Sequence, residues 1–260
     1  MQELTGSYIV TGGASGLGAA CSKALAGRGA KVVIADLNED AGTALADSLE
    51  GMARFVKVDV TDEAQCQQAV EVAVELGGTG AGGGLRGLVG CAGVAPSMKV
   101  VGREGAHDLG VFSKAVGINL VGLFNMFRLS AAAMVKNETD ANGQRGVLIN
   151  TASIAAQDGQ IGQCAYAASK AGVIGLTLPA ARELARHGVR VMTIAPGIFD
   201  TAMMAGFSDE IREGLAKLVP FPPRLGDPNE FASLVLHILD NPMLNGETIR
   251  LDGALRMSAR

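Results

Sequence analysis

Three side chains in the second half of the chain have types and spacing suited to proton transfer. Ser153 follows an apolar stretch at 146–152 that is predicted to form a strand, and Tyr166 and Lys170 lie in an Ala-rich segment predicted to be helical. Their i, i+4 spacing puts both side chains on one helix face. A free tyrosine has a pKa of about 10, and a neighbouring ammonium favours its phenolate. Tyr166 is therefore a candidate general base, with Lys170 as its tuner and Ser153 fixing the reacting oxygen. Taken alone, such a Tyr–Lys pair is more often an ordinary surface pair.

A glycine-rich turn near the start of the chain has the setting of a phosphate-binding loop. Residues 7–11 are predicted to form a short buried strand, 12–18 read Gly-Gly-Ala-Ser-Gly-Leu-Gly, and 19–28 are predicted to form a helix. The glycines let the backbone approach a pyrophosphate, and the helix N-terminus offers free N–H groups and a positive dipole. The spacing differs from the common Gly-x-Gly-x-x-Gly order, so a plain glycine-rich turn is the alternative.

The carboxylate of Asp36 bears on which nicotinamide cofactor the chain would take. Asp36 ends the next predicted strand, 31–35, about 20 positions after the glycine turn, where an acidic residue would hold a ribose 2′-hydroxyl. A carboxylate there repels a 2′-phosphate, and neither Lys nor Arg follows Asp36 closely. The sequence therefore favours NAD over NADP, with an Asp that only begins a turn as the alternative.

Further candidate site residues lie at or after later strands. Asp59 ends the predicted strand at 54–58 and would accept from an adenine amino group or help to cap the next helix. The small residues 91–93 would let a nucleotide lie on the backbone, or would form a close-packed turn. Asn119 lies within a long predicted helix, 108–136, and would hold a water or bond the backbone.

Strands and helices alternate along the whole sequence, which predicts an α/β fold with a doubly wound parallel sheet, the Rossmann fold. We expect a single NAD(P)-binding domain over 1–260, with 198–227 inserted after the sixth strand as a Pro-rich substrate-binding loop. Ligands in such folds bind at the carboxyl ends of the strands. The candidates that fall there are Gly12, Asp36, Asp59, Cys91, Ser153 and Pro196.

Composition excludes several other classes. The net charge is −4 and Lys and Arg form no block, so we expect no nucleic-acid partner. The four cysteines and three histidines are scattered, which predicts free thiols in a reducing compartment and no metal site. The first seven residues contain no apolar signal segment and no apolar run looks long enough to span a bilayer, so we expect no membrane partner. The expected location is the cytoplasm, or the mitochondrial matrix if the source is eukaryotic.

Taken together, these motifs resemble the short-chain dehydrogenase/reductase family. They are Thr11-Gly12-x-x-x-Gly16-x-Gly18, Asn119, Ser153, Tyr166-x-x-x-Lys170 and Pro196-Gly197, in the family's order over the whole chain. The stretches at 220–228 and 241–254 are most similar to members acting on short or branched 3-hydroxyacyl-CoA thioesters. The resemblance implies an NAD-dependent alcohol/ketone oxidoreductase that is usually a homotetramer, with an acyl-CoA or another small secondary alcohol as substrate.

The resemblance also implies roles for individual residues. Asn119 would join Ser153, Tyr166 and Lys170 as a catalytic residue through a proton-relaying water, and Gln163 would contact substrate beside Ser153 and Tyr166. The implied cofactor contacts are Gly12, Ser15, Gly16, Leu17, Gly18, Asp36, Asp59, Val60, Cys91, Ala92, Gly93, Tyr166, Lys170, Pro196, Gly197, Phe199 and Thr201. Gly90 departs from the family, which usually has Asn there to support the central strands.

Three alternatives remain at the level of the sequence. The chain could reduce a 3-oxoacyl group on an acyl carrier protein, although such reductases usually use NADP and a basic residue near the loop. It could be a hydroxysteroid or sugar-alcohol dehydrogenase. From a different class, it could be a nucleotide-binding scaffold subunit, against which the intact Ser153, Tyr166 and Lys170 argue.

Overall fold

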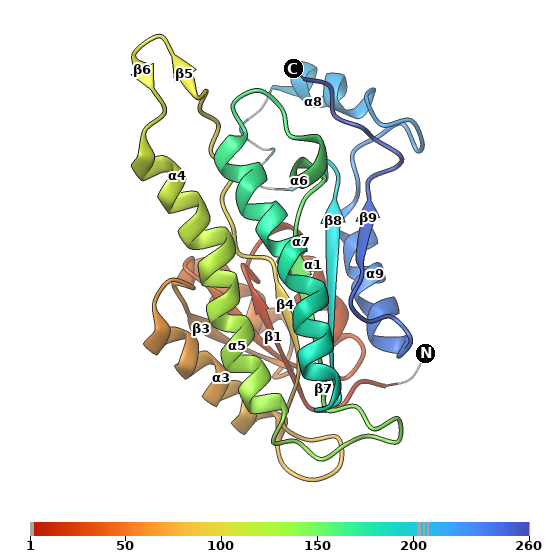
Figure 1. The fold of residues 1–260 in the computed structure, drawn as a ribbon. Coiled ribbons are helices and arrows are strands. Elements are labelled where there is room, and N and C mark those ends of the chain that lie inside the picture. Colours follow the sequence, from red (N-terminus) through yellow and green to blue (C-terminus); the bar gives the residue numbers. More distant parts are fainter. Residues whose placement is uncertain (1–2, 202–203, 205, 207, 260) are drawn as a thin grey trace.

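A computed structural model describes residues 3–201, 204, 206 and 208–259. Its helices and strands alternate along the chain (Figure 1). The strands are β1 (Ser7–Thr11), β2 (Lys31–Asp36), β3 (Ala53–Lys57), β4 (Leu85–Gly90), β5 (Val101–Gly102), β6 (Gly105–Ala106), β7 (Gly146–Thr151), β8 (Val189–Pro196) and β9 (Thr248–Leu251). The helices are α1 (Gly16–Ala26), α2 (Glu39–Ser48), α3 (Glu63–Gly77), α4 (Leu109–Val116), η1 (Gly117–Gly122), α5 (Leu123–Met134), α6 (Ala155–Asp158), α7 (Cys164–Ala185), α8 (Asp209–Ala216) and α9 (Pro228–Asp240).

Seven strands form one parallel sheet in the order β3-β2-β1-β4-β7-β8-β9, which confirms the predicted doubly wound α/β fold. The central strands β1, β4, β7 and β8 are buried along their whole length, as expected for strands covered on both faces. The order reverses at β1, since β2 lies on one side of it and β4 on the other. That switch point is where ligands bind in such folds.

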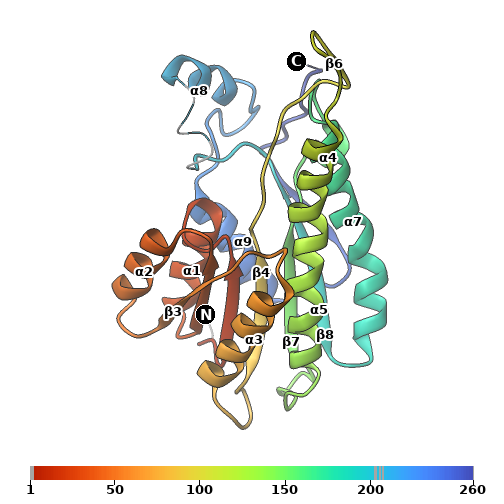
Figure 2. The same cartoon turned by 90° about the vertical axis from the view of Figure 1, so that its left-hand side faces the viewer.

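Helices cover both faces of the sheet (Figure 2). On one face α1, α2 and α9 enclose an apolar cluster that includes Leu25, Ile34 and Phe231. On the other face α3, α5 and α7 enclose a second cluster that includes Leu88 and Met126. Because both faces are closed by packed side chains, the carboxyl edge of the sheet is left to build a site.

The predicted helix at 108–136 is continuous but contains a wider turn. α4 passes through the π-helical η1 into α5, and η1 includes Asn119. The whole helix, Leu109–Met134, is long and apolar enough to cross a membrane by length and composition, but Lys114 and Arg128 interrupt it, so it is not an uninterrupted apolar run. Its buried residues, among them Met126 and Met134, pack in the cluster beneath α3. One helix of this length and composition is weak evidence of a span.

The predicted loop at 198–227 also contains a helix. Ser208 caps α8 by accepting from the Ile211 N–H, and Figure 1 shows α8 beyond the carboxyl ends of β8 and β9. Residues 202, 203, 205 and 207 of this predicted loop lie outside the described residues. The α8 helix escaped prediction because its flanks are rich in Pro and Gly, which mark loops.

Candidate active site

A cleft of about 960 Å³ runs along the carboxyl edge of the sheet. Each residue predicted to contact cofactor or substrate lines it, and these residues are Gly12, Ser15, Gly16, Leu17, Gly18, Asp36, Asp59, Val60, Cys91, Ala92, Gly93, Ser153, Gln163, Tyr166, Lys170, Pro196, Gly197, Phe199 and Thr201. Asn119 is the one predicted site residue that does not line it. The cleft is at the upper end of the size range of ligand pockets, which suits a dinucleotide and a small substrate together.

The glycine loop is built for close approach of a phosphate group. Gly12 has φ +63°, and a Cβ there would come within 2.9 Å of the Ala92 backbone nitrogen. A Cβ on Gly18 would collide with the carbonyl oxygen of Gly12, so the loop and the start of α1 pack without side chains between them. Ser15 precedes α1 without a side-chain cap bond, which leaves N–H groups of the first turn available to an anion in the cleft.

Asp36 is held rigidly at the end of β2. One carboxylate oxygen accepts from the Ala14 N–H and the other from the Asn38 N–H, both at 3.0 Å. These bonds fix the carboxylate beside the glycine loop. Among the described lining residues the cations are Lys114 and Lys170, which lie on α4 and α7 and not on the segments beside Asp36. The surroundings of Asp36 therefore suit a ribose hydroxyl better than a phosphate.

Asp59 also lines the cleft with a fixed carboxylate. Its Oδ1 accepts from the Thr61 hydroxyl at 2.6 Å and from the Thr61 N–H at 2.9 Å. These bonds lower the pKa of Asp59. The cap of α3 comes instead from Asp62, which accepts from the Gln65 N–H. Asp59 is thus not the capping residue, which leaves its carboxylate facing the cleft.

Tyr166 and Lys170 stand on the first turns of α7, as the four-residue spacing predicted. The Lys170 Nζ lies 5.9 Å from the centroid of the Tyr166 ring and donates to the Thr151 carbonyl at 2.8 Å. Lys170 is only 4 % exposed, and this burial lowers its pKa to about 8. A lysine ammonium in this setting releases its proton far more readily than one in water.

Ser153 opposes the effect of burial on Tyr166. Burial raises the pKa of Tyr166, and the hydrogen bond with the Ser153 side chain opposes that rise. The Lys170 Nζ donates to the Thr151 carbonyl, and its effect on Tyr166 stays a prediction. The Ser153 hydroxyl is held in turn by the Ala155 N–H at 3.1 Å.

Asn119 is fully buried and its side chain is committed to protein partners. Its Oδ1 accepts from the Val94 N–H, while its Nδ2 donates to the Val94 carbonyl at 2.8 Å and to the Ser169 hydroxyl at 3.0 Å. Both amide hydrogens are therefore used. The side chain ties the segment after β4 to η1 and α7, which is the backbone-bonding alternative raised from the sequence. Its role in a water relay stays a prediction.

Two thiols meet beneath the cleft. Cys91 lines the cleft and Cys21 is buried on α1. A hydrogen bond between them lowers the pKa of Cys91, with smaller contributions from the Thr151 hydroxyl and the charge of Lys170. The same bond, together with burial, raises the pKa of Cys21.

The structure adds lining residues that sequence reasoning missed. They are Ala35, Leu37, Val58, Val94, Ala95, Lys114, Ile118, Thr151, Ala152, Ile154, Ala155, Ile198, Met204 and Met257. Most adjoin predicted positions and could have been found by extending each strand end by one or two residues. Met257 has no such signal, because it comes from the C-terminal end of the chain.

Groups of three or more potential metal ligands are not found in the described part of the chain.

Comparison with known proteins decides the family. Residues 7–212 match the family model described as short chain dehydrogenase. The chain belongs to this family. As a short-chain dehydrogenase it is an oxidoreductase that uses a nicotinamide cofactor, and the cradle around Gly12 and Gly18 fits such a group.

Relatives of this short-chain dehydrogenase are similar over almost their full length. This chain is 51% identical over 251 residues to 3-hydroxyacyl-CoA dehydrogenase type-2 of Drosophila melanogaster, and the match covers 96% of each chain. It is 49% identical over 251 residues to the Homo sapiens protein of the same name, covering 96% of this chain and 94% of that one. The crystal structure of 3-hydroxyacyl-CoA dehydrogenase type-2 from Mycobacterium avium matches with a TM-score of 0.93 and 46% identity, covering 98% of this chain and 97% of that chain.

Proposed function

We propose that this short-chain dehydrogenase oxidises short or branched 3-hydroxyacyl-CoA thioesters to 3-oxoacyl-CoA with NAD. The observation that carries the proposal is one cleft that holds both the anchored carboxylate of Asp36 and the Ser153–Tyr166–Lys170 set. The names of the relatives at 49–51% identity support the acyl-CoA substrate. Asp36 supports NAD, because its charge would repel a 2′-phosphate.

The chemistry divides between cofactor and protein. When bound, the nicotinamide accepts a hydride from the carbinol carbon of the substrate. The phenolate form of Tyr166 takes the hydroxyl proton as that hydride leaves and becomes the phenol, a positioned proton transfer worth about 10²- to 10⁴-fold in rate. Ser153 hydrogen-bonds the same oxygen and fixes it beside Tyr166. Lys170, with its lowered pKa, can take up or release a proton at Nζ and would hold the ribose hydroxyls.

The experiment is a kinetic screen on the purified protein. 3-Hydroxyacyl-CoA thioesters of increasing chain length and branching are compared with NAD and with NADP, beside a hydroxysteroid and a 3-oxoacyl group on acyl carrier protein. We expect NAD and a short acyl-CoA to give the highest kcat/KM. A preference for NADP, or for the carrier-protein substrate, would contradict the proposal.

The variant Tyr166→Phe tests the assignment of the base. It removes only the phenol oxygen, so we expect turnover to fall by at least about 10²-fold. NADH binding, followed by its fluorescence, should stay unchanged because the ring and Lys170 remain. Retained turnover would show that Tyr166 is not the proton acceptor. Loss of turnover beside intact binding would also argue against a purely scaffolding role.

We further propose a homotetramer in the cytoplasm, or in the mitochondrial matrix of a eukaryotic source. Exposed apolar side chains on η1, α5 and α7, among them Val121, Phe124 and Leu178, give a surface suited to another copy of the chain. The free thiols suit a reducing compartment. Sedimentation equilibrium tests the assembly, and a monomer at micromolar concentration would contradict it.

A further inference from the structure

The C-terminal residues 252–259, called the tail here, fold back onto the carboxyl edge of the sheet. The tail follows β9, the last strand of the sheet, and the Ile161 N–H donates to the Ala259 carbonyl at 3.0 Å. Met257 lines the same cleft as Gln163 and Tyr166, and it packs against the apolar cluster of Ile154, the residue after Ser153. The tail therefore reaches the half of the cleft where the substrate is expected.

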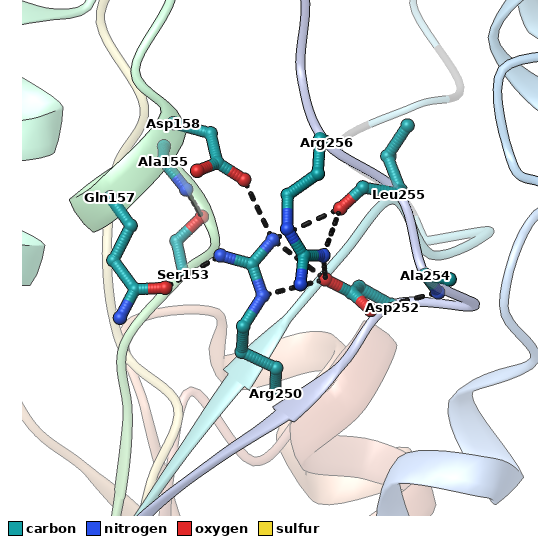
Figure 3. A network of polar contacts seen from close by, with 9 residues as sticks. All are labelled: Ser153, Ala155, Gln157, Asp158, Arg250, Asp252, Ala254, Leu255 and Arg256. Atoms are coloured by element: carbon teal, nitrogen blue, oxygen red, sulfur yellow. Dashed lines mark hydrogen bonds and ion pairs between the residues drawn. The ribbon is translucent and has the colours of Figure 1, made fainter.

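Arg250 joins the tail to the segment that carries Ser153 (Figure 3). Its guanidinium donates to the Gln157 Oε1 at 2.6 Å and to the Asp158 Oδ2 at 2.7 Å, both on α6. On the tail side it donates to the Asp252 Oδ2 at 2.8 Å and to the Leu255 carbonyl at 3.0 Å. One side chain thus spans two segments that lie more than 90 residues apart in the sequence.

The bonds of Arg250 to Asp158 and Asp252 are partly shielded from water, unlike most surface ion pairs. The side chains of Arg250, Asp158 and Asp252 are 18 %, 19 % and 7 % exposed. Arg256 adds a contact to the Asp252 Oδ2 at 3.2 Å. A planar guanidinium with several fixed acceptors positions its neighbours more tightly than an exposed pair does. The contact is therefore suited to orienting α6.

A shift of α6 would also displace Ser153. Only Ile154 separates Ser153 from α6, and the Ala155 N–H, the first of that helix, donates to the Ser153 Oγ at 3.1 Å. The side chain of Ile154 packs with Leu255 of the tail and with Val219 in one small apolar cluster. The polar bonds of Arg250 and this cluster hold the same turn.

We propose that Arg250 is a positioning residue: it fixes the turn that presents Ser153 and holds the tail so that Met257 forms a wall of the substrate side of the cleft. The inference rests on the proposed function, since it takes Ser153 to contact the reacting oxygen. It names Met257 as a residue that selects the acyl chain. Small displacements of a catalytic group cost up to about 10²-fold in rate, which sets the size of the expected effect.

The topology predicts that the substrate is affected more than the cofactor, although Pro196 and Gly197, two expected cofactor contacts, adjoin β9. The loop after β1 and Asp36 on β2, which are expected to bind NAD, lie across the sheet from β9 in the order β3-β2-β1-β4-β7-β8-β9. Loosening the tail should therefore lower kcat and raise the KM for substrate, while NADH affinity stays within about twofold. A general loss of folding would instead weaken both together.

The first test is a double-mutant cycle with Ser153, using 3-hydroxybutyryl-CoA and NAD. Arg250→Met should lower kcat/KM between about 10- and 100-fold, and Arg250→Lys should recover part of the loss. In a Ser153→Ala background the same Arg250→Met change should cost less than about threefold, because the group that it positions is gone. Equal losses in both backgrounds, or parallel loss of NADH binding, would overturn the proposal.

The matched control is Arg28→Met. Arg28 also makes a two-bond pair with a carboxylate, Asp240, and its side chain is 10 % exposed, but it joins α1 to α9 and does not line the cleft. We expect kcat/KM to stay within about twofold of the wild type. If Arg250→Met does not fold, Asp158→Asn breaks the same contact from the α6 side and replaces it in the cycle.

The second test is Met257→Ala, which enlarges the wall without touching Ser153. The kcat/KM ratio of a six-carbon to a four-carbon 3-hydroxyacyl-CoA should rise at least about 10-fold, since even one extra methylene accommodated in an apolar pocket is worth that much. An unchanged ratio would show that Met257 does not contact the acyl chain.

If the wild type does not oxidise acyl-CoA, the proposed function fails. The cycle with Ser153 is then run on whichever secondary alcohol the enzyme turns over, and still decides the role of Arg250.

Discussion

The buried ammonium of Lys170 should make stability depend on pH in a direction that can be worked out. Burial lowers its pKa to about 8 from its ordinary value of 10.5, so the difference is 10.5 − 8, or 2.5. At 1.36 kcal/mol per pKa unit this is about 3 kcal/mol of unfavourable free energy in the folded, cofactor-free chain at neutral pH. Between pH 8 and 10.5 the unfolded chain keeps a proton that the folded chain has released. The free energy of unfolding therefore rises with pH through this window.

The perturbation that isolates this effect is Lys170→Met, which keeps the length of the side chain and removes the titrating group. Urea unfolding of the cofactor-free wild type and variant is measured at pH 7 and pH 9.5. Other titrating groups cancel when the two proteins are subtracted at each pH. We expect the stability of the wild type relative to the variant to increase by about 2 kcal/mol from pH 7 to pH 9.5.

The control is Lys31→Met, which removes a surface lysine whose Nζ also donates to a backbone carbonyl, that of Gly51 at 3.2 Å. A difference between wild type and Lys170→Met that is flat with pH, or that falls, would refute the reasoning. It would mean that water or a shifted carbonyl solvates Lys170 in the folded chain. A rise as large in the control would assign the effect to net charge instead of burial.

Three further perturbations follow from the same geometry. Asp36→Ala should reduce the NAD:NADP ratio of kcat/KM at least about 10-fold, with Asp36→Asn as the control for lost charge; an unchanged ratio would contradict the role of the carboxylate. Gly90→Asn should stabilise the chain by about 1 kcal/mol in urea unfolding, because Gly90 pairs with Asn150, whose buried Oδ1 has no partner among the described residues. The control Gly90→Ala also removes the flexibility of glycine but adds no side-chain amide. Equal stabilities of the Asn and Ala variants would show that the introduced amide does not hydrogen-bond Asn150. Iodoacetamide should label Cys91 several-fold more slowly in Cys21→Ala, followed by mass spectrometry, and NADH should protect both proteins; equal rates would show that the thiol pair does not activate Cys91.

Much of the fold and site could be predicted because their signals are local. A few consecutive residues are enough to recognise the glycine loop at 12–18. The same is true of the apolar strands that end near Asp36 and Ser153. The parallel topology then brings such strand ends to one edge of the sheet. Lys170 was placed correctly for the same reason, because helical periodicity alone puts it beside Tyr166.

What could not be predicted depends on partners that are distant in sequence. The Asn119 side-chain amide hydrogen-bonds the backbone of Val94, 25 residues away in the sequence. The residue type alone did not tell whether the amide would bond the backbone or a water. Arg250 meets Asp158 across 92 residues, and nothing near either one marks the other. The bond from the Lys170 Nζ to the Thr151 carbonyl was likewise not predicted, since the spacing does not show where the Nζ points.

The contact between Arg250 and α6 bears on the order in which the molecule matures during synthesis. On the ribosome, the glycine loop and the strands around it leave the exit tunnel long before Arg250 does, and a domain generally folds as a unit. The turn that presents Ser153 therefore reaches its final position only after β9 and the tail have been synthesised. Contacts of such long sequence separation are also slow to form in refolding. Nucleotide affinity should accordingly return before turnover does when the denatured protein is diluted into buffer.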